Sequence, residues 1–170
     1  MVTQNYPESR SEARNVRLLT ILDYIQAKLS EYEKSESHRL RDVLDVDFLE
    51  RTPPRFKVQR DLFRFPGVYV MSENGAPIYV GMTGKKKRTL NDRISDLFYY
   101  SPNNPKVANR YHHMVTGKLV IKVHRFSTIA QVRDFYLQSC SLRVVQTQTF
   151  AQARTIEAIL IEILQPQYND

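Results

Sequence analysis

The chain of 170 residues has little of several features that define other classes of protein. It contains one cysteine, Cys140, so no intrachain disulfide can form, and it contains no tryptophan. Its apolar-rich stretches, such as 119–121 and 158–161, are far shorter than the roughly 20 residues that a helix needs to span a bilayer. The first 17 residues mix Gln, Glu, Ser and Arg without an apolar core, which is not the pattern of a secretory signal. These absences predict a reduced, cytoplasmic protein without membrane contact.

The composition that remains is that of a packed globule with an excess of positive charge. Hydrophobic residues make up 42% of the chain and charged residues 25%, which favours one domain with a short extension. The formal net charge is +7, and ten basic residues stand against two acidic ones between Met82 and Ala130. Such a localised basic zone favours a polyanionic partner, because lysines and arginines that neutralise phosphates release counterions. A merely solvated surface is the alternative.

The N-terminal part of the chain is expected to be helical. Residues 12–34 predict an amphipathic helix, since Val16, Leu19, Leu22, Ile25 and Leu29 recur at spacings of three and four. Residues 40–48 suggest a second short helix, and two prolines at 53 and 54 stop it. We therefore expect a helical N-terminal extension over residues 1–60 and a second domain over residues 61–170.

The second domain alternates strand and helix patterns. Residues 67–72 and 77–81 are rich in β-formers and flank an Asn74-Gly75 pair, which predicts a β-hairpin. Helices are expected over 90–100, 106–116, 127–139 and 150–164, and further strands over 118–126 and 142–147. The fold class that follows is α+β, with a small, mainly antiparallel sheet flanked by helices.

Five short motifs follow one another in this second domain. They are Gly67-Val68-Tyr69, Tyr79-Val80-Gly81, an arginine at Arg93 within 90–94, a glutamate at Glu157, and a terminal run 166–169 that ends in Asn169. Each alone is ordinary, because tyrosines favour strands and single charges favour surfaces. In this order the five resemble the GIY-YIG nuclease family, and the absence of a visible extra domain makes the chain most similar to small restriction-type or phage-type members.

The resemblance implies a divalent-metal-dependent DNA endonuclease that hydrolyses phosphodiester bonds. It implies that Tyr69 accepts a proton from the attacking water and that Tyr79 positions water or phosphate. It also implies that Arg93 binds a non-bridging phosphate oxygen. It also implies that Glu157 ligates one cation, Mg²⁺ with Mn²⁺ as a substitute, and that Asn169 braces the site. A phenol with a pKa near 10 is a poor base at neutral pH, so nearby positive charge has to assist it.

Two positions depart from the pattern of the family. Met82 stands where many members have a lysine, and Leu97 where many have a histidine or tyrosine. These positions do not identify the auxiliary proton-transfer group, and His112 and His113 are among the candidates for it. The loop before Arg93 is also longer than in compact members, which makes Arg88 a rival for the catalytic arginine.

The expected substrate is double-stranded DNA, gripped by the basic zone. The candidate phosphate contacts are Lys85, Lys86, Lys87, Arg88, Lys106 and Arg110. Sequence-specific, restriction-type cleavage by a homodimer is the finer expectation by analogy. The alternative is a catalytically silent DNA-binding module that retains the fold.

Overall fold

The computed structural model describes residues 10–44, 63–83, 88–97 and 129–169. The chain divides into two compact units, Met1–Lys34 and Ser35–Asp170. The expected helix over 106–116 and strand over 118–126 lie outside the described residues. So do the candidate site residues Lys85, Lys86, Lys87, Lys106, Arg110, His112 and His113.

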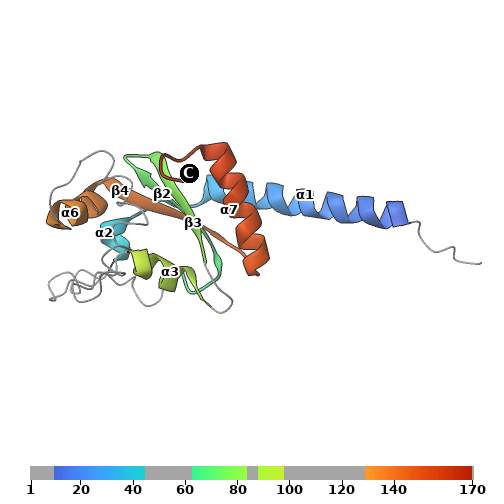
Figure 1. Cartoon of the computed structure of the whole chain (residues 1–170), viewed down its shortest axis with the longest axis horizontal. Helices are drawn as coiled ribbons and strands as arrows, with labels where there is room; N and C mark the ends of the chain where they lie inside the picture. Colours follow the sequence, from blue (N-terminus) through green and yellow to red (C-terminus); the bar gives the residue numbers. More distant parts are fainter. Residues whose placement is uncertain (1–9, 45–62, 84–87, 98–128, 170) are drawn as a thin grey trace, which may run out of the picture. The chain divides into compact units, whose positions relative to one another are not determined.

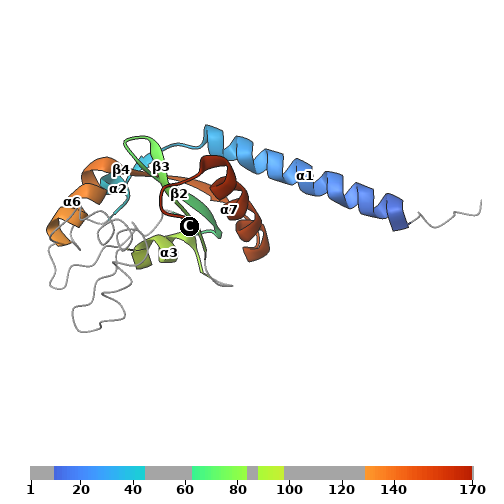
Figure 2. The ribbon, with the colours of Figure 1, turned by 45° about the horizontal axis from the view of Figure 1, so that its top comes forward.

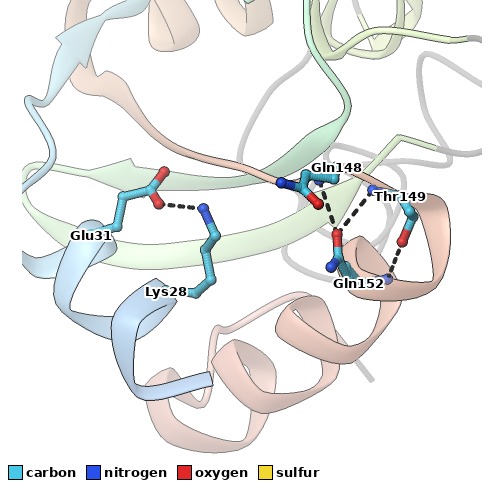
Figure 3. Close-up of polar contacts among 5 residues, drawn as sticks. All are labelled: Lys28, Glu31, Gln148, Thr149 and Gln152. Atoms are coloured by element: carbon cyan, nitrogen blue, oxygen red, sulfur yellow. Dashed lines mark hydrogen bonds and ion pairs between the residues drawn. The ribbon is translucent and has the colours of Figure 1, made fainter. Parts of the chain in front are cut away.

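The first unit contains one long helix, α1 (Arg10–Lys34), coloured blue in Figure 1. This confirms the helix predicted over 12–34. Within its C-terminal half, Lys28 donates to the carboxylate of Glu31 one turn later (Figure 3). Among the described residues, no helix combines the length and apolar character that a membrane crossing needs.

The second unit is built on a four-stranded antiparallel sheet (Figures 1 and 2). In chain order its elements are β1 (His38–Arg39), α2 (Leu40–Val43), β2 (Gly67–Glu73), β3 (Ala76–Met82), α3 (Leu90–Leu97), α6 (Ile129–Ser139), β4 (Cys140–Gln146) and α7 (Phe150–Leu164). The strands lie in the order β1-β4-β2-β3, so the hairpin occupies one side of the sheet and β3 is an edge strand. The predicted α+β class and the antiparallel sheet are confirmed.

The division between the two units lies earlier in the chain than the boundary near residue 60 that the sequence favours. Leu40, Val43 and Leu44 are almost completely buried and belong to the core that includes Met71 and Leu142 of the sheet. β1 pairs with β4, with His38 opposite Leu142. Residues 35–44 are therefore part of the sheet domain, because burial of these apolar side chains fixes them to it.

The hairpin follows directly from its turn residues. Asn74 and Gly75 have φ values of 49° and 89°, and two successive positive values are what a tight two-residue turn between antiparallel strands requires. The side chains or backbone of Gly67–Met71 are all buried. Because side chains alternate between the two faces of a strand, both faces of β2 are covered.

Helix α7 is fixed at its first turn by capping residues. Thr149 accepts a hydrogen bond from the Gln152 amide, and the Gln152 side chain accepts from the Thr149 amide, which makes a capping box for α7 (Figure 3). α7 packs on β2 and β3 and buries Ala153, Ile156 and Leu160. It ends where Gln165 adopts a left-handed conformation, one residue before a proline.

The first turn of α3 is anchored to the chain just before β2. The Leu90 amide donates to the carbonyl of Phe65 at 2.8 Å, and the Asn91 amide donates to that of Phe63 at 3.0 Å. At the helix start the Thr89 amide and hydroxyl both donate to the Asp92 carboxylate at 2.9 Å, and the Asp92 amide donates to the Thr89 hydroxyl oxygen at 3.3 Å. These bonds satisfy amides that the first turn of a helix leaves open and fix the helix that carries Arg93 against β2.

Candidate active site

The two motif tyrosines lie together on the hairpin. Tyr69 of β2 is opposite Gly81 of β3, and Tyr79 is opposite Met71, so both side chains emerge on the same face. Their ring centroids are 6.0 Å apart with an interplanar angle of 42°. Tyr69 is completely buried, whereas Tyr79 is only partly buried. Solvent and a ligand can thus reach Tyr79 more readily than Tyr69.

Gly81 leaves the space that the Tyr69 hydroxyl occupies. A Cβ atom at position 81 would collide with the Tyr69 hydroxyl oxygen and would lie 2.6 Å from Tyr69 Cζ and 2.8 Å from Tyr79 Cε1. Real Cβ atoms do not come this close to other heavy atoms. The glycine of the second motif is therefore needed for close approach, and the tyrosine of the first motif is what approaches it.

The Tyr69 hydroxyl is a buried polar group that makes no hydrogen bond with the described residues. Its pKa is raised well above the ordinary value, chiefly by burial and further by Tyr79 and Glu157, while Arg93 lowers it. The two phenols influence each other's pKa, although the Tyr69 hydroxyl does not meet hydrogen-bond geometry. A buried hydroxyl without a hydrogen-bond partner costs stability.

Arg93 and Glu157 act on both tyrosines. Burial raises the pKa of Tyr79. Arg93, half-buried on α3, lowers this pKa in part, and Glu157 adds to the rise. The pKa of Glu157 on α7 is raised by burial and is lowered in part by Arg93 and Arg154. Four groups from three parts of the sequence therefore form one electrostatic cluster, with a cation and an anion around a pair of phenols.

Asn169 holds the open edge of the sheet. Its side-chain oxygen accepts from the Val80 amide and its side-chain nitrogen donates to the Val80 carbonyl, both at 2.6 Å. The Tyr168 amide donates to the Ile78 carbonyl at 3.0 Å. The C-terminal segment thus pairs with β3 on the side away from β2, which satisfies backbone groups at that edge. Asn169 contacts the backbone between Tyr79 and Gly81 and positions both.

The motifs and the topology agree. The hairpin carries both half-motifs, the next helix carries the arginine, and the last helix carries the glutamate before an asparagine that returns to the hairpin. The resemblance noted from the sequence thus has a counterpart in how the described residues are arranged.

The chain is similar to several solved structures. One is the GIY-YIG N-terminal endonuclease domain of UvrC from Thermotoga maritima bound to its catalytic divalent cation, magnesium, with 23% sequence identity, 64% of this chain and 86% of that chain covered, and a TM-score of 0.36. An asparagine-to-alanine point mutant of the same domain matches with 22% identity, the same coverage and the same TM-score. No family model matches the chain, and no curated protein matches it.

The donor groups present suit a magnesium ion with few protein ligands. Within the described part of the chain, no three His, Cys, Asp or Glu side chains are grouped closely enough to make a closed metal site. Glu157 is a partly buried carboxylate whose charged form is disfavoured by burial, so a nearby cation would stabilise it. Mg²⁺ is commonly held by one or two carboxylates together with water and substrate phosphate. Glu157 fits that role.

Two residues contribute to the site without having been picked out by sequence reasoning. Arg154 lies one turn before Glu157 on the exposed side of α7 and lowers its pKa, and its spacing of three from Glu157 was the available signal. Thr89 caps α3, the helix that carries Arg93, and the sequence pattern Thr-x-x-Asp predicts such a cap. Arg88, the rival arginine, lies half-buried just before α3.

Proposed function

We propose that the protein is a divalent-metal-dependent DNA endonuclease whose site comprises Tyr69, Tyr79, Arg93 and Glu157, with Asn169 as a positioning residue. The observation that carries the proposal is the cluster itself, in which a guanidinium and a carboxylate act on two adjacent phenols, one buried and one partly buried. Hydrolysis of a phosphodiester needs neutralised phosphoryl oxygens, an activated water and stabilisation of the leaving oxygen. This cluster has a group for each need.

Arg93 is the group proposed to bind a non-bridging phosphate oxygen. A guanidinium stays charged at all relevant pH values and presents several donors to phosphate. Its helix is held by the bonds of Leu90, Asn91 and Thr89 described above, which restricts the positions that Arg93 can adopt. A phosphate bound there lies next to both phenols.

The two tyrosines are proposed to handle the proton of the attacking water as a pair. Tyr79 is the partly exposed member and orients the water, whereas Tyr69 is the buried member to which the proton passes. Burial makes each phenol a weaker acid, so a phenolate at Tyr69 is a stronger base once formed, and Arg93 favours its formation. A phosphate and a cation in the site change the local charge further.

Glu157 is proposed to hold one Mg²⁺, for which Mn²⁺ substitutes. The bound ion supplies positive charge that stabilises the departing oxygen. Arg93 also offsets part of the rise that burial causes in the pKa of Glu157.

The substrate is proposed to be double-stranded DNA, cut in a sequence-specific, restriction-type manner in the cytoplasm. Support for a nucleic acid comes from the basic zone between residues 82 and 130, in which Lys85, Lys86, Lys87, Arg88, Lys106 and Arg110 are the proposed phosphate contacts. His112 and His113 remain the proposed auxiliary groups in place of those absent at Met82 and Leu97. The N-terminal residues 1–60 are proposed to help grip the DNA, although their described part after Lys34 packs in the sheet domain.

A catalytically silent DNA-binding module is the second candidate. The full burial and raised pKa of Tyr69 favour it, since both disfavour the phenolate. Incubation of supercoiled plasmid with the purified protein, with Mg²⁺ and with a chelator, separates the two. Metal-dependent nicking or linearisation supports the endonuclease. Binding without cleavage in either condition supports the silent module.

A further inference from the structure

Arg154 is a positive charge on α7 that the proposed phosphate contacts do not include. The buried residues of this helix are Ala153, Ile156 and Leu160. Glu157 is partly buried at the margin of that buried side, and Arg154, three residues earlier, is exposed. Residues three apart are neighbours on the surface of a helix. The two side chains therefore lie on one flank of α7, with Arg154 further from the core.

The Arg154 guanidinium is available to a ligand. Within the described ranges of the chain, no hydrogen bond or close ion pair holds it, and its charge acts on Glu157 from beyond hydrogen-bonding distance. An arginine that precedes a glutamate by one turn is the less favourable order for such a pair on a helix. A cation in the N-terminal half of a helix also gains nothing from the helix dipole. Stabilisation of α7 therefore does not account for an arginine at this position.

Two guanidinium groups act on Glu157 from different elements. Arg93 acts from α3, and Arg154 acts from one turn earlier in α7. Arg93 also acts on Tyr69 and Tyr79, so it belongs to the phenol side of the site, whereas Arg154 is exposed to solvent. A DNA strand presents one phosphate after another. A strand whose scissile phosphate binds at Arg93 thus offers a neighbouring phosphate to a second cation near Glu157.

We infer that Arg154 is a DNA-binding residue whose guanidinium binds a phosphate next to the scissile one, so that the bound strand passes along the flank of α7 beside Glu157. The inference rests on the proposed function for the identity of the substrate. A guanidinium stays charged and presents several donors to phosphate oxygens. Because a phosphate contact contains no sequence information, this contact contributes affinity and placement of the strand for every DNA sequence.

DNA binding by Arg154→Gln in the full chain tests the contact. Fluorescence anisotropy with two labelled duplexes of different sequence, in a chelator, measures affinity without cleavage. The substitution should weaken binding of both duplexes about tenfold and should lower the slope of log binding constant against log salt concentration by about one. Thr155→Ala shortens the next exposed side chain on α7 and is the control, which should bind as the wild type does. Unchanged affinity and salt slope in Arg154→Gln would overturn the inference.

The same substitution in a Glu157→Gln background separates a direct contact from an effect through the carboxylate. If Arg154 binds phosphate itself, its loss should weaken binding by the same factor in both backgrounds. A loss that disappears in the Glu157→Gln background would mean that Arg154 acts only through Glu157, which would also overturn the inference.

Cleavage of the same duplexes in Mg²⁺ distinguishes this contact from the proposed function. A wild type that binds DNA without cutting it, together with weaker binding by Arg154→Gln, would support the contact and refute the endonuclease. A wild type that cuts DNA, together with unchanged binding by Arg154→Gln, would refute the contact alone. Absence of any DNA binding by the wild type would overturn both.

Discussion

The hydroxyl group of Tyr69 lies directly over the α-carbon of Gly81, in the space that a side chain at position 81 would fill. The two residues are opposite each other in the register of β2 and β3. The close approach ties the first half-motif to the second, because the Tyr69 hydroxyl can lie here only when residue 81 has no side chain.

Gly81→Ala is expected to destabilise the protein by about 1–3 kcal/mol, the usual cost of overpacking a well-packed core. The nearest atom in the collision is the Tyr69 hydroxyl oxygen, so the same substitution should cost less in a Tyr69→Phe background. Gly67→Ala is the matched control, since its Cβ would collide with the Val145 carbonyl and gain nothing from loss of the hydroxyl. Denaturant unfolding of the single and double variants measures the difference. If Tyr69→Phe changed the cost of both glycine substitutions equally, the hydroxyl would not be the group with which a side chain at position 81 collides.

Glu157→Gln is expected to abolish cleavage and to increase stability at neutral pH. Burial raises the pKa of Glu157, so the folded state binds a proton more tightly than the unfolded state, and stability falls as pH rises from below the ordinary value through the raised one. A neutral glutamine removes that loss. Thermal unfolding at several pH values between about 3 and 7 compares the variant with the wild type.

The difference in stability should grow as pH rises through that window and then level off. Glu162→Gln, an exposed glutamate on the same helix, is the control and should show no such trend. A gap between Glu157→Gln and the wild type that is independent of pH would mean that the carboxylate charge is not what burial disfavours.

Asn169→Ala is expected to release the edge of β3. Two hydrogen bonds of 2.6 Å to the Val80 backbone disappear, at a cost of about 1–3 kcal/mol. The Val80 amide should then exchange with solvent faster by a factor of at least ten, which hydrogen exchange followed by NMR can measure. Gln167→Ala removes an exposed amide side chain two residues earlier and should leave this exchange unchanged. Unaltered protection of Val80 in Asn169→Ala would show that the segment does not hold the edge.

Thr89→Ala is expected to weaken the start of α3 by about 1 kcal/mol and to slow any cleavage, because the helix positions Arg93. Thr89→Ser keeps the hydroxyl and should restore both stability and rate. Unfolding curves together with single-turnover rates test the link. A loss of rate that serine does not rescue would argue against the hydroxyl as the cause.

The elements nearest the motifs could be predicted well from the sequence. Asn74-Gly75 between two β-forming runs specifies the hairpin, and the apolar stripe of 150–164 specifies α7 to the residue. These features depend on local periodicity and turn chemistry, which a single sequence contains. The five motifs contain the residues that the fold brings together in the candidate site.

Other features depend on long-range contacts and could not be predicted in this way. β1 has two residues and exists only because β4 pairs with it, so no local pattern announces His38–Arg39 as a strand. The burial of Leu40 and Val43 within the sheet domain depends on the same pairing. The complete burial of Tyr69, which raises its pKa, follows from packing on both faces of β2. The alternation of residues along the strand does not predict it.

The single-turnover rate of DNA cleavage in Mg²⁺, measured with protein in saturating excess, tests the proposed site most directly. Tyr69→Phe, Arg93→Ala and Glu157→Gln should each lower the rate by at least about 100-fold while binding DNA as the wild type does. Arg88→Ala should bind more weakly and cut at nearly the wild-type rate once saturated. Full activity of Tyr69→Phe, or a larger loss at Arg88 than at Arg93, would contradict the account.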